Sequence, residues 1–257
     1  MDTRSTILGK RRRNAEKLGK KLRRAVRIGD HSLARRLIEH GAPADYTCGD
    51  GKTTLHVAVF VGNLEMVQLL VTEGVDKAAL DTDGRTPLRI AVILGKCAVA
   101  EALLDENDDL GTHLHTAAVV GNVDMVQMLV SKGADKAALN TEGQTPLVIA
   151  VILGKCAVAE ALLDENDDLG THLHTAAVMG NVDMVQMLVS KGADKTALNI
   201  EGRTPLMAAI RLGRCAVTEA LLDDNDDLDA HLHTAAGLGN VDMVQMLVSK
   251  GADKDSG

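Results

Sequence analysis

The 257-residue sequence has almost no aromatic side chains, with one Phe, one Tyr and no Trp. It therefore offers almost none of the aromatic faces on which proteins stack single-stranded nucleic acid. Long hydrophobic runs are missing too, since no segment approaches the roughly 18 consecutive apolar residues of a membrane span. The start of the chain is charged and lacks the apolar segment of a secretory signal. Because 46% of the residues are hydrophobic, the chain can nevertheless build a core, from Leu, Val, Ile, Met and Ala.

A nearly identical internal repeat organises the sequence. Residues 111–135 and 170–194 differ at one position, where Val120 is replaced by Met179. Within this 59-residue period, the Leu residues that open successive apolar segments are spaced by 33, 33, 26, 33, 26, 33 and 26 residues. This spacing predicts eight units. The opening residues are Leu22, Leu55, Leu88, Leu114, Leu147, Leu173, Leu206 and Leu232.

Each unit carries the signals of a helix, a turn and a second helix. A Thr precedes the first apolar segment, where its hydroxyl can accept a hydrogen bond from a free N–H of the helix. A Gly ends this segment, and a second apolar segment follows with helical spacing, as in residues 123–131. The capping residues are predicted to be Thr53, Thr86, Thr112, Thr145, Thr171 and Thr204, and Ala230 replaces this Thr in the last unit.

Two longer motifs recur in these units. Gly-x-Thr-Pro-Leu stands at 84–88, 143–147 and 202–206, and Gly-Asn-x-x-Met-Val-Gln-x-Leu-Val-x-x-Gly begins at Gly62 and recurs from Gly121, Gly180 and Gly239. From about residue 22 to residue 253 the chain resembles the ankyrin-repeat family. The resemblance implies an all-α solenoid of stacked helix-turn-helix units with projecting β-hairpin loops, here called fingers. It also implies a concave surface that binds other proteins, and no catalysis.

The 26-residue spacing departs from the family pattern. From the third unit onward, an acidic loop seven residues shorter replaces every second finger, at 105–110, 164–169 and 223–228. We expect fingers only near 43–52, 76–85, 135–144 and 194–203. Pairs of units thus form 59-residue modules. A basic segment of residues 1–16 is expected to precede one continuous solenoid of residues 17–257.

The short loops invite a calcium-binding interpretation. Asp105, Asn107 and Asp109 match the opening of an EF-hand loop, but Leu110 stands where the loop needs Gly, and Thr116 where it needs a bidentate Glu. Acidic residues in this place are expected instead to face the positive end of the next helix.

The His-Leu-His motif, first seen at His113 and His115, invites a zinc-binding interpretation. Residues at i and i+2 of a helix point to different sides, so the pair cannot converge on one ion. The resemblance implies that the second His hydrogen-bonds across neighbouring turns. Because the sequence also lacks a nucleophile triad, a phosphate-binding loop and a Cys-x-x-Cys motif, we predict no enzyme activity, metal or cofactor.

Three of the four cysteines, Cys97, Cys156 and Cys215, are 59 residues apart. Stacked units place such positions about 20 Å apart, too far for a disulfide. They are therefore expected to be reduced core residues of an intracellular protein, cytoplasmic or nuclear.

The net charge of −8 hides a basic start to the chain, because residues 1–40 contain 13 Lys and Arg against four acidic residues. This start can act as a polar cap on the solenoid, an import signal or presequence, or a contact for nucleic acid or another anion. Neither nucleic acid nor membrane is the predicted partner. The basic patch comprises Arg11, Arg12, Arg13, Lys20, Lys21, Arg23 and Arg24.

The predicted partner is another protein, held as an apolar or amphipathic helix in the concave groove. Two apolar residues end each first helix on this side, and the first of each pair is expected to be the more exposed. The apolar set is Phe60, Ile93, Leu94, Val119, Val120, Ile152, Leu153, Val178, Met179 and Leu212. Finger-tip residues that set the register are Asp50, Lys52, Asp83, Arg85, Glu142, Gln144, Glu201 and Arg203.

Two further roles follow from the sequence. The last unit repeats the internal sequence without polar substitutions, so a partner or a second copy is expected to cover it unless the chain is a fragment. The alternative to an adaptor or scaffold is a structural subunit held permanently in a larger assembly, or an anion-binding module that uses the basic patch.

Overall fold

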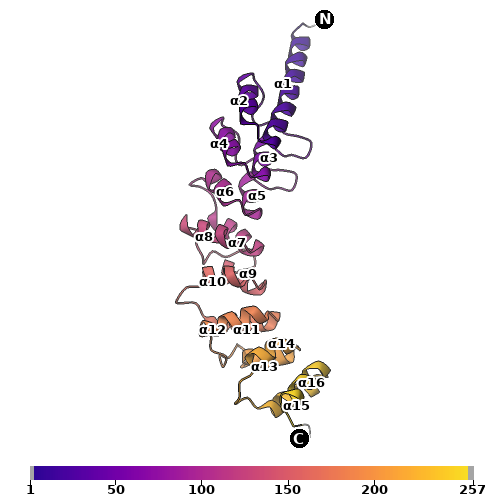
Figure 1. The fold of residues 1–257 in the computed structure, drawn as a ribbon, viewed down its shortest axis with the longest axis vertical. Coiled ribbons are helices and arrows are strands. Elements are labelled where there is room, and N and C mark those ends of the chain that lie inside the picture. Colours follow the sequence, from indigo (N-terminus) through magenta and orange to yellow (C-terminus); the bar gives the residue numbers. More distant parts are fainter. Residues whose placement is uncertain (1–2, 254–257) are drawn as a thin grey trace. The chain divides into compact units, whose positions relative to one another are not determined.

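The computed structural model describes residues 3–253, with side chains from residue 11 on, so the outermost residues of both predicted segments lie outside it. The described residues form sixteen helices and no strand beyond one bridge between Thr47 and Thr53. This confirms the all-α prediction (Figure 1). The chain divides into two compact units, Met1–Ala134 and Asp135–Gly257, and each of them contains four of the helix pairs that correspond to the predicted repeats.

The helices follow one another as pairs in each unit. The first unit contains α1 (Thr3–Ile28), α2 (His31–Glu39), α3 (Thr54–Val61), α4 (Leu64–Thr72), α5 (Pro87–Ile93), α6 (Cys97–Leu103), α7 (Leu110–Val120) and α8 (Val123–Ser131). The second contains α9 (Pro146–Ile152), α10 (Cys156–Leu162), α11 (Leu169–Met179), α12 (Val182–Ser190), α13 (Pro205–Arg211), α14 (Cys215–Leu221), α15 (Leu228–Gly237) and α16 (Val241–Ser249).

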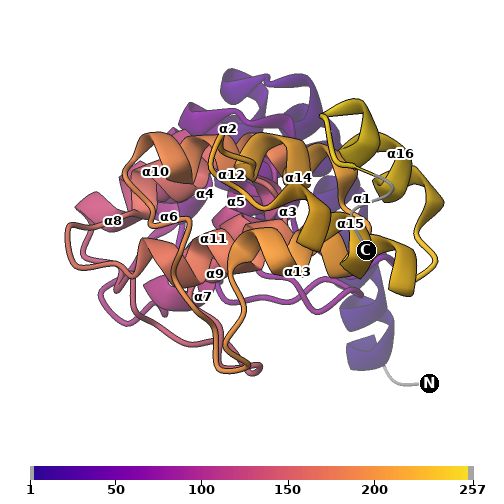
Figure 2. The ribbon, with the colours of Figure 1, turned by 90° about the horizontal axis from the view of Figure 1, so that it is seen from below.

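The first and second helices of the pairs form two layers within each unit. In the second unit, α9, α11, α13 and α15 contact one another in turn, as do α10, α12, α14 and α16 (Figure 2). The first unit is built in the same way. All eight opening Leu residues are buried between the layers, none more than 7% exposed. The predicted register of the apolar core is therefore correct.

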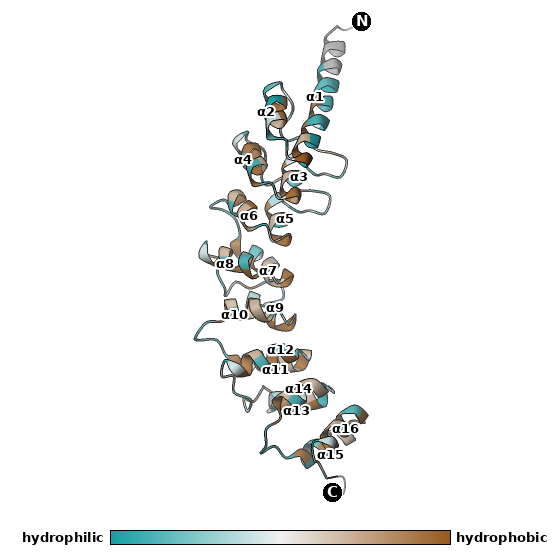
Figure 3. Ribbon diagram, viewed as in Figure 1, coloured by the Kyte–Doolittle hydropathy of each residue, from teal (hydrophilic) through white to brown (hydrophobic). Residues whose placement is uncertain are grey.

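The basic start of the chain is part of α1, so the expected boundary at residue 16 lies inside a helix. Leu22, Ala25 and Val26 of α1 are buried, whereas Arg11 to Arg13 are exposed. Figure 3 shows this change from hydrophilic to hydrophobic along α1. Gly19 lies against the only Tyr of the chain, where a Cβ atom would come within 2.2 Å of the Tyr46 ring.

Two kinds of residue cap the first helices. Thr53, Thr86, Thr145 and Thr204 cap α3, α5, α9 and α13 as predicted. The prediction for Thr112 and Thr171 is wrong, because α7 and α11 begin earlier and are capped by Asp109 and Asp168.

The short loop explains the difference in capping. It places a carboxylate three residues before the Thr, and both the N–H and the hydroxyl of Thr171 donate to Asp168, at 3.2 and 2.7 Å. Asp227 caps α15 in the same way, accepting from the N–H of Ala230 at 3.0 Å. Ala230 therefore marks a lost hydroxyl contact and not a lost cap.

Each acidic loop is also tied to the preceding finger. Lys195, in the finger before α13, donates to the carbonyl of Leu221 at the end of α14 and to Asp223 in the short loop, at 3.3 and 2.7 Å. Lys136 makes the equivalent two bonds in its module, and Lys77 does so in the first unit. A cation at a helix C-terminus stabilises the free carbonyls there. The repeat pattern of the sequence did not predict this role of the lysine.

We expect Asp168→Ala to lower the free energy of unfolding by about 1 kcal/mol at pH 7, the usual effect of losing a side-chain cap. The hydrogen bonds from Thr171 lower the pKa of Asp168. Its contribution is therefore present above the unfolded-state value of about 3.9 and is lost as the pH falls through the folded-state pKa. Urea denaturation from pH 7 to pH 3 should show the two proteins converging. Glu165→Ala, in the same loop, is the control, and an equal loss there would refute the assignment.

Lys195→Met should lower the free energy of unfolding by about 1 kcal/mol, because it leaves the end of α14 and Asp223 without their cation. Lys191→Met is the matched control, since Lys191 is more exposed, at 44% against 26%, and pairs only with Glu160. The expected loss for the control is below about 0.5 kcal/mol. Equal urea midpoints for the two variants would show that the helix-end contact contributes nothing.

Candidate functional site

The four fingers stand where the spacing predicts them, as hydrogen-bonded turns without regular strands. In all four the carbonyl of the fifth residue of the turn accepts a backbone bond from the N–H of the first, as from Asn199 N–H to the carbonyl of Arg203 at 2.9 Å. The Asn199 side chain also accepts from the N–H groups of Glu201 and Arg203, at 2.9 and 3.0 Å. This local bonding holds the tips in a defined conformation.

Histidines connect the first helices to the following fingers, as the family resemblance implied. Nε2 of His56 donates to the carbonyl of Arg85 at 3.0 Å, while its Nδ1 accepts from the N–H of Thr53 at 3.2 Å, which fixes the tautomer. His174 donates in the same way to the carbonyl of Ala197 at 2.8 Å. Each finger bonded in this way is positioned directly against the first helix before it.

The predicted apolar residues differ in exposure. Phe60 and Val119 are 68% and 50% exposed and exceed the residues that follow them, as expected. The expectation is wrong for Ile93, Ile152 and Val178, which are half-buried.

The helix ends account for this difference. The helices α5 and α9 end one residue earlier relative to the opening Leu, so that Leu94 and Leu153 become the C-terminal caps and turn outward, at 39% and 46% exposed. Val178 lines a pocket beside the following finger.

Several predicted finger-tip charges are already paired. Asp50 accepts from Arg23 of α1 at 3.2 Å, and this bond lowers the pKa of the carboxyl group. Arg85 pairs with Asp81, whose side chain is fully buried, and with Asp83. These contacts fix the tips of the first two fingers. The ion pair between Asp50 and Arg23 also joins the first finger to the predicted basic patch.

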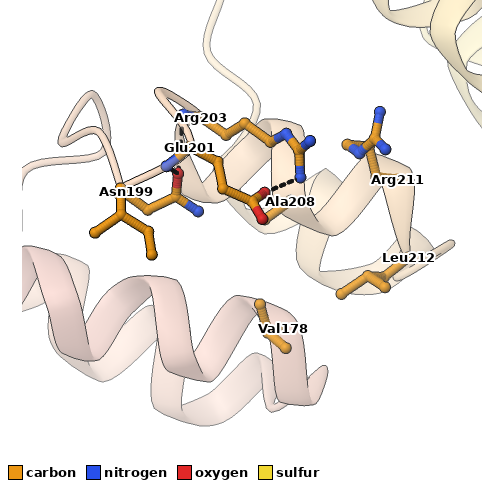
Figure 4. Close-up of a pocket in the computed structure, with 8 residues that line it drawn as sticks. Val178, Asn199, Glu201, Arg203, Ala208, Arg211 and Leu212 are labelled. Carbon is orange, nitrogen blue, oxygen red and sulfur yellow. Dashed lines mark hydrogen bonds and ion pairs between the residues drawn. The ribbon is translucent and has the colours of Figure 1, made fainter.

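The second unit contains a pocket of about 470 Å³ between the finger 194–203, the end of α11 and the end of α13. It brings together four predicted residues, Val178, Glu201, Arg203 and Leu212, and four that the sequence analysis missed, Asn199, Ile200, Ala208 and Arg211 (Figure 4). Ile200 is fully exposed at the rim. Comparison of the modules with each other, position by position, would have singled out Ile200 and Arg211.

The histidines and cysteines that the sequence singled out form no metal site among the described residues. Burial lowers the pKa of His113 and His172, which disfavours their charged forms. Among the described residues, no three His, Cys, Asp or Glu side chains are placed to hold a metal ion. All four cysteines are free and half-buried, so Cys97, Cys156 and Cys215 are not the core residues that the sequence predicted. Burial raises the pKa of the Cys97 and Cys156 thiols. No described helix is long and apolar enough to cross a membrane.

The sequence matches the family of ankyrin repeats (3 copies) over residues 22–113, 105–171 and 173–257. The chain therefore belongs to the ankyrin-repeat family, whose fold is in general a non-catalytic scaffold for binding other proteins. Among solved structures, the ankyrin repeat domain of Bcl-3, a member of the IkappaB family, is 30% identical, with a TM-score of 0.62 over 78% of this chain and 96% of that one. The human ASB11 ankyrin repeat domain, 20% identical, shares the fold with a TM-score of 0.59, over 90% of this chain and 98% of that one.

Two curated relatives are longer proteins. The mouse B-cell lymphoma 3 protein homolog is 33% identical over 161 residues, which are 55% of this chain and 36% of that protein. A Caenorhabditis elegans homolog of transient receptor potential cation channel subfamily A member 1 is 30% identical over 57% of this chain and 13% of its own length. The chain thus spans well under two thirds of either relative.

Proposed function

We propose that the chain is a non-catalytic adaptor or scaffold that binds another protein on the face formed by its first helices and fingers, the concave face in the family. The supporting observation is the set of exposed apolar side chains at the ends of the first helices. They are 39% to 68% exposed: Phe60, Val61, Leu94, Val119 and Val120 in the first unit, and Leu153, Met179, Leu212 and Leu238 in the second. Clustered apolar side chains of this kind mark interaction surfaces.

The geometry of these side chains favours a helical partner. In every helix pair from α3 on, an exposed apolar residue stands six residues after the buried opening Leu, and Phe60 and Val119 stand one position before it in their pairs. An apolar or amphipathic helix laid along such a face can meet them with every second turn, because two turns rise about 11 Å and neighbouring pairs stack about 10 Å apart. Four free cysteines without a disulfide fit the intracellular location proposed here.

The last helix pair differs in exposure from its internal copies. His233 and Ala236 of α15 and Val241 of α16 are exposed, whereas the equivalent His174 and Ala177 are buried and Val182 is half-buried. We propose that a partner, a second copy or further repeats of a longer chain cover these residues.

The anion-binding alternative has less support. Arg23 of the basic patch is engaged by Asp50, and Lys20 pairs with Glu16 at 2.8 Å. Arg11, Arg12, Arg13, Lys21 and Arg24 are exposed. If these residues bind a nucleic acid, the affinity falls steeply with added salt.

Replacing Phe60, Leu94, Val119, Leu153 and Leu212 together by Ser should abolish recovery of protein partners by cross-linking mass spectrometry of the full chain. Because these side chains are exposed, circular dichroism and the urea midpoint should change little. The control carries Gln68→Lys, Gln127→Lys and Gln186→Lys, at exposed positions of the second helices. The control should keep its partners, and the proposal is wrong if the Ser variant keeps them as well.

A further inference from the structure

The pocket beside the finger 194–203 lies where two modules differ from each other. Residues 111–169 and 170–228 differ at 11 of 59 aligned positions. Four of these differences, at Ile200, Arg203, Ala208 and Arg211, fall among the eight residues that line the pocket. The other seven are spread over 51 positions. The later module thus keeps the packing of the earlier one and differs most strongly at this surface.

The four differences change the shape of the apolar surface and its charge. Ile200 replaces Thr141 and adds an exposed aliphatic side chain at the rim, while Ala208 replaces Ile149 and removes bulk from the floor. The two others add positive charge, because Arg203 and Arg211 replace Gln144 and Ile152. The result is an apolar hollow next to two guanidinium groups (Figure 4).

One of these guanidinium groups is available to a partner. Arg203 forms an ion pair with Glu201, but Arg211 is exposed and makes no hydrogen bond or ion pair with any described residue. In the finger 76–85 the corresponding arginine, Arg85, has two carboxylate partners. In the finger 194–203, Asn199 stands at the position of Asp81, the buried carboxylate, so Arg203 lacks this second carboxylate partner. The pocket therefore has an excess of positive charge in a chain whose net charge is −8.

We propose that this pocket binds a peptide segment of a protein partner in which an apolar side chain stands next to a carboxylate. The apolar side chain lies against Val178, Ile200 and Leu212, and the carboxylate pairs with Arg211, which can bind it with two parallel hydrogen bonds. The open rim suits an extended chain better than a small molecule, which a pocket usually encloses. This inference rests on the proposed protein-binding function and names the chemistry of the partner.

The charge of the rest of the chain makes the pairing selective. An acidic segment is repelled by a protein of net negative charge, so its binding depends on the local guanidinium groups. A basic or purely polar segment gains nothing at this position, because it leaves either Arg211 or the apolar wall without a matching group.

Four fluorescent peptides with Gly-Ser flanks test the proposal on the full chain by anisotropy. Their central residues are Glu-Leu-Leu-Glu, Glu-Ser-Ser-Glu, Lys-Leu-Leu-Lys and Ser-Leu-Leu-Ser. We expect Glu-Leu-Leu-Glu to bind about tenfold or more tightly than the other three, in keeping with the loss of one charged hydrogen bond or one buried apolar side chain. Its affinity should also fall with added salt.

Substitutions that install the residue of the preceding module supply the matched variants. Arg211→Ile and Ile200→Thr should each weaken binding of Glu-Leu-Leu-Glu about tenfold. Thr196→Ala and Asp224→Glu do the same at positions outside the pocket lining and should leave the affinity unchanged. Each of the four introduced residues already stands at the aligned position of the preceding module. The urea midpoint verifies the fold of each variant.

Three outcomes would overturn the inference. Equal binding of Glu-Leu-Leu-Glu and Glu-Ser-Ser-Glu, or competition by inorganic phosphate at similar concentration, would reveal a simple anion site. Equal binding of the three Leu peptides would reveal a nonspecific apolar surface. Unchanged affinity in Arg211→Ile and Ile200→Thr would place the peptide elsewhere. The proposed function fails separately, when the five-residue Ser variant keeps its cross-linked partners.

Discussion

No helix pair of this chain can bury its own apolar face, and the rest of the structure depends on that constraint. The pairs have helices of only seven to eleven residues, apart from α1, too short to be stable alone. Each is stabilised by the apolar faces of the pairs before and after it in its unit. The buried opening Leu residues mark this shared core. A change of register by one residue would turn them out of it.

The polar contacts repeat in step with this core. A Thr or an Asp caps each first helix from α3 to α15, a His bonds forward to a finger carbonyl, and a Lys joins a finger to the next helix end. All these bonds lie at the turns between helices. The side chains at the ends of the first helices and at the tips of the later fingers take part in few of these contacts. Their side chains can therefore differ between modules, as Ile200 and Arg211 do, without loss of the stack.

Much of the fold could be predicted because the sequence repeats. The spacing of the Leu residues located the core, and the missing seven residues located the short loops and the four fingers. The caps of α7 and α11 could not be predicted in this way, since Thr112 and Thr171 occupy the same place in the motif as the true caps. Only the loop geometry brings Asp109 and Asp168 into position. Four of the eight residues that line the pocket were predicted. Periodicity reveals the residues that the repeats share, whereas Ile200 and Arg211 differ from the residues at the aligned positions of the preceding module.

In the proposed binding mode, the first helices and fingers contact the partner, while the second helices only support them. Hydrogen–deuterium exchange of the full chain, free and saturated with the Glu-Leu-Leu-Glu peptide, tests this directly. We expect slower exchange on binding in residues 199–203 and 208–212, and no change in α12 and α14. Protection confined to α12 and α14, with the finger and the end of α13 unaffected, would contradict the account.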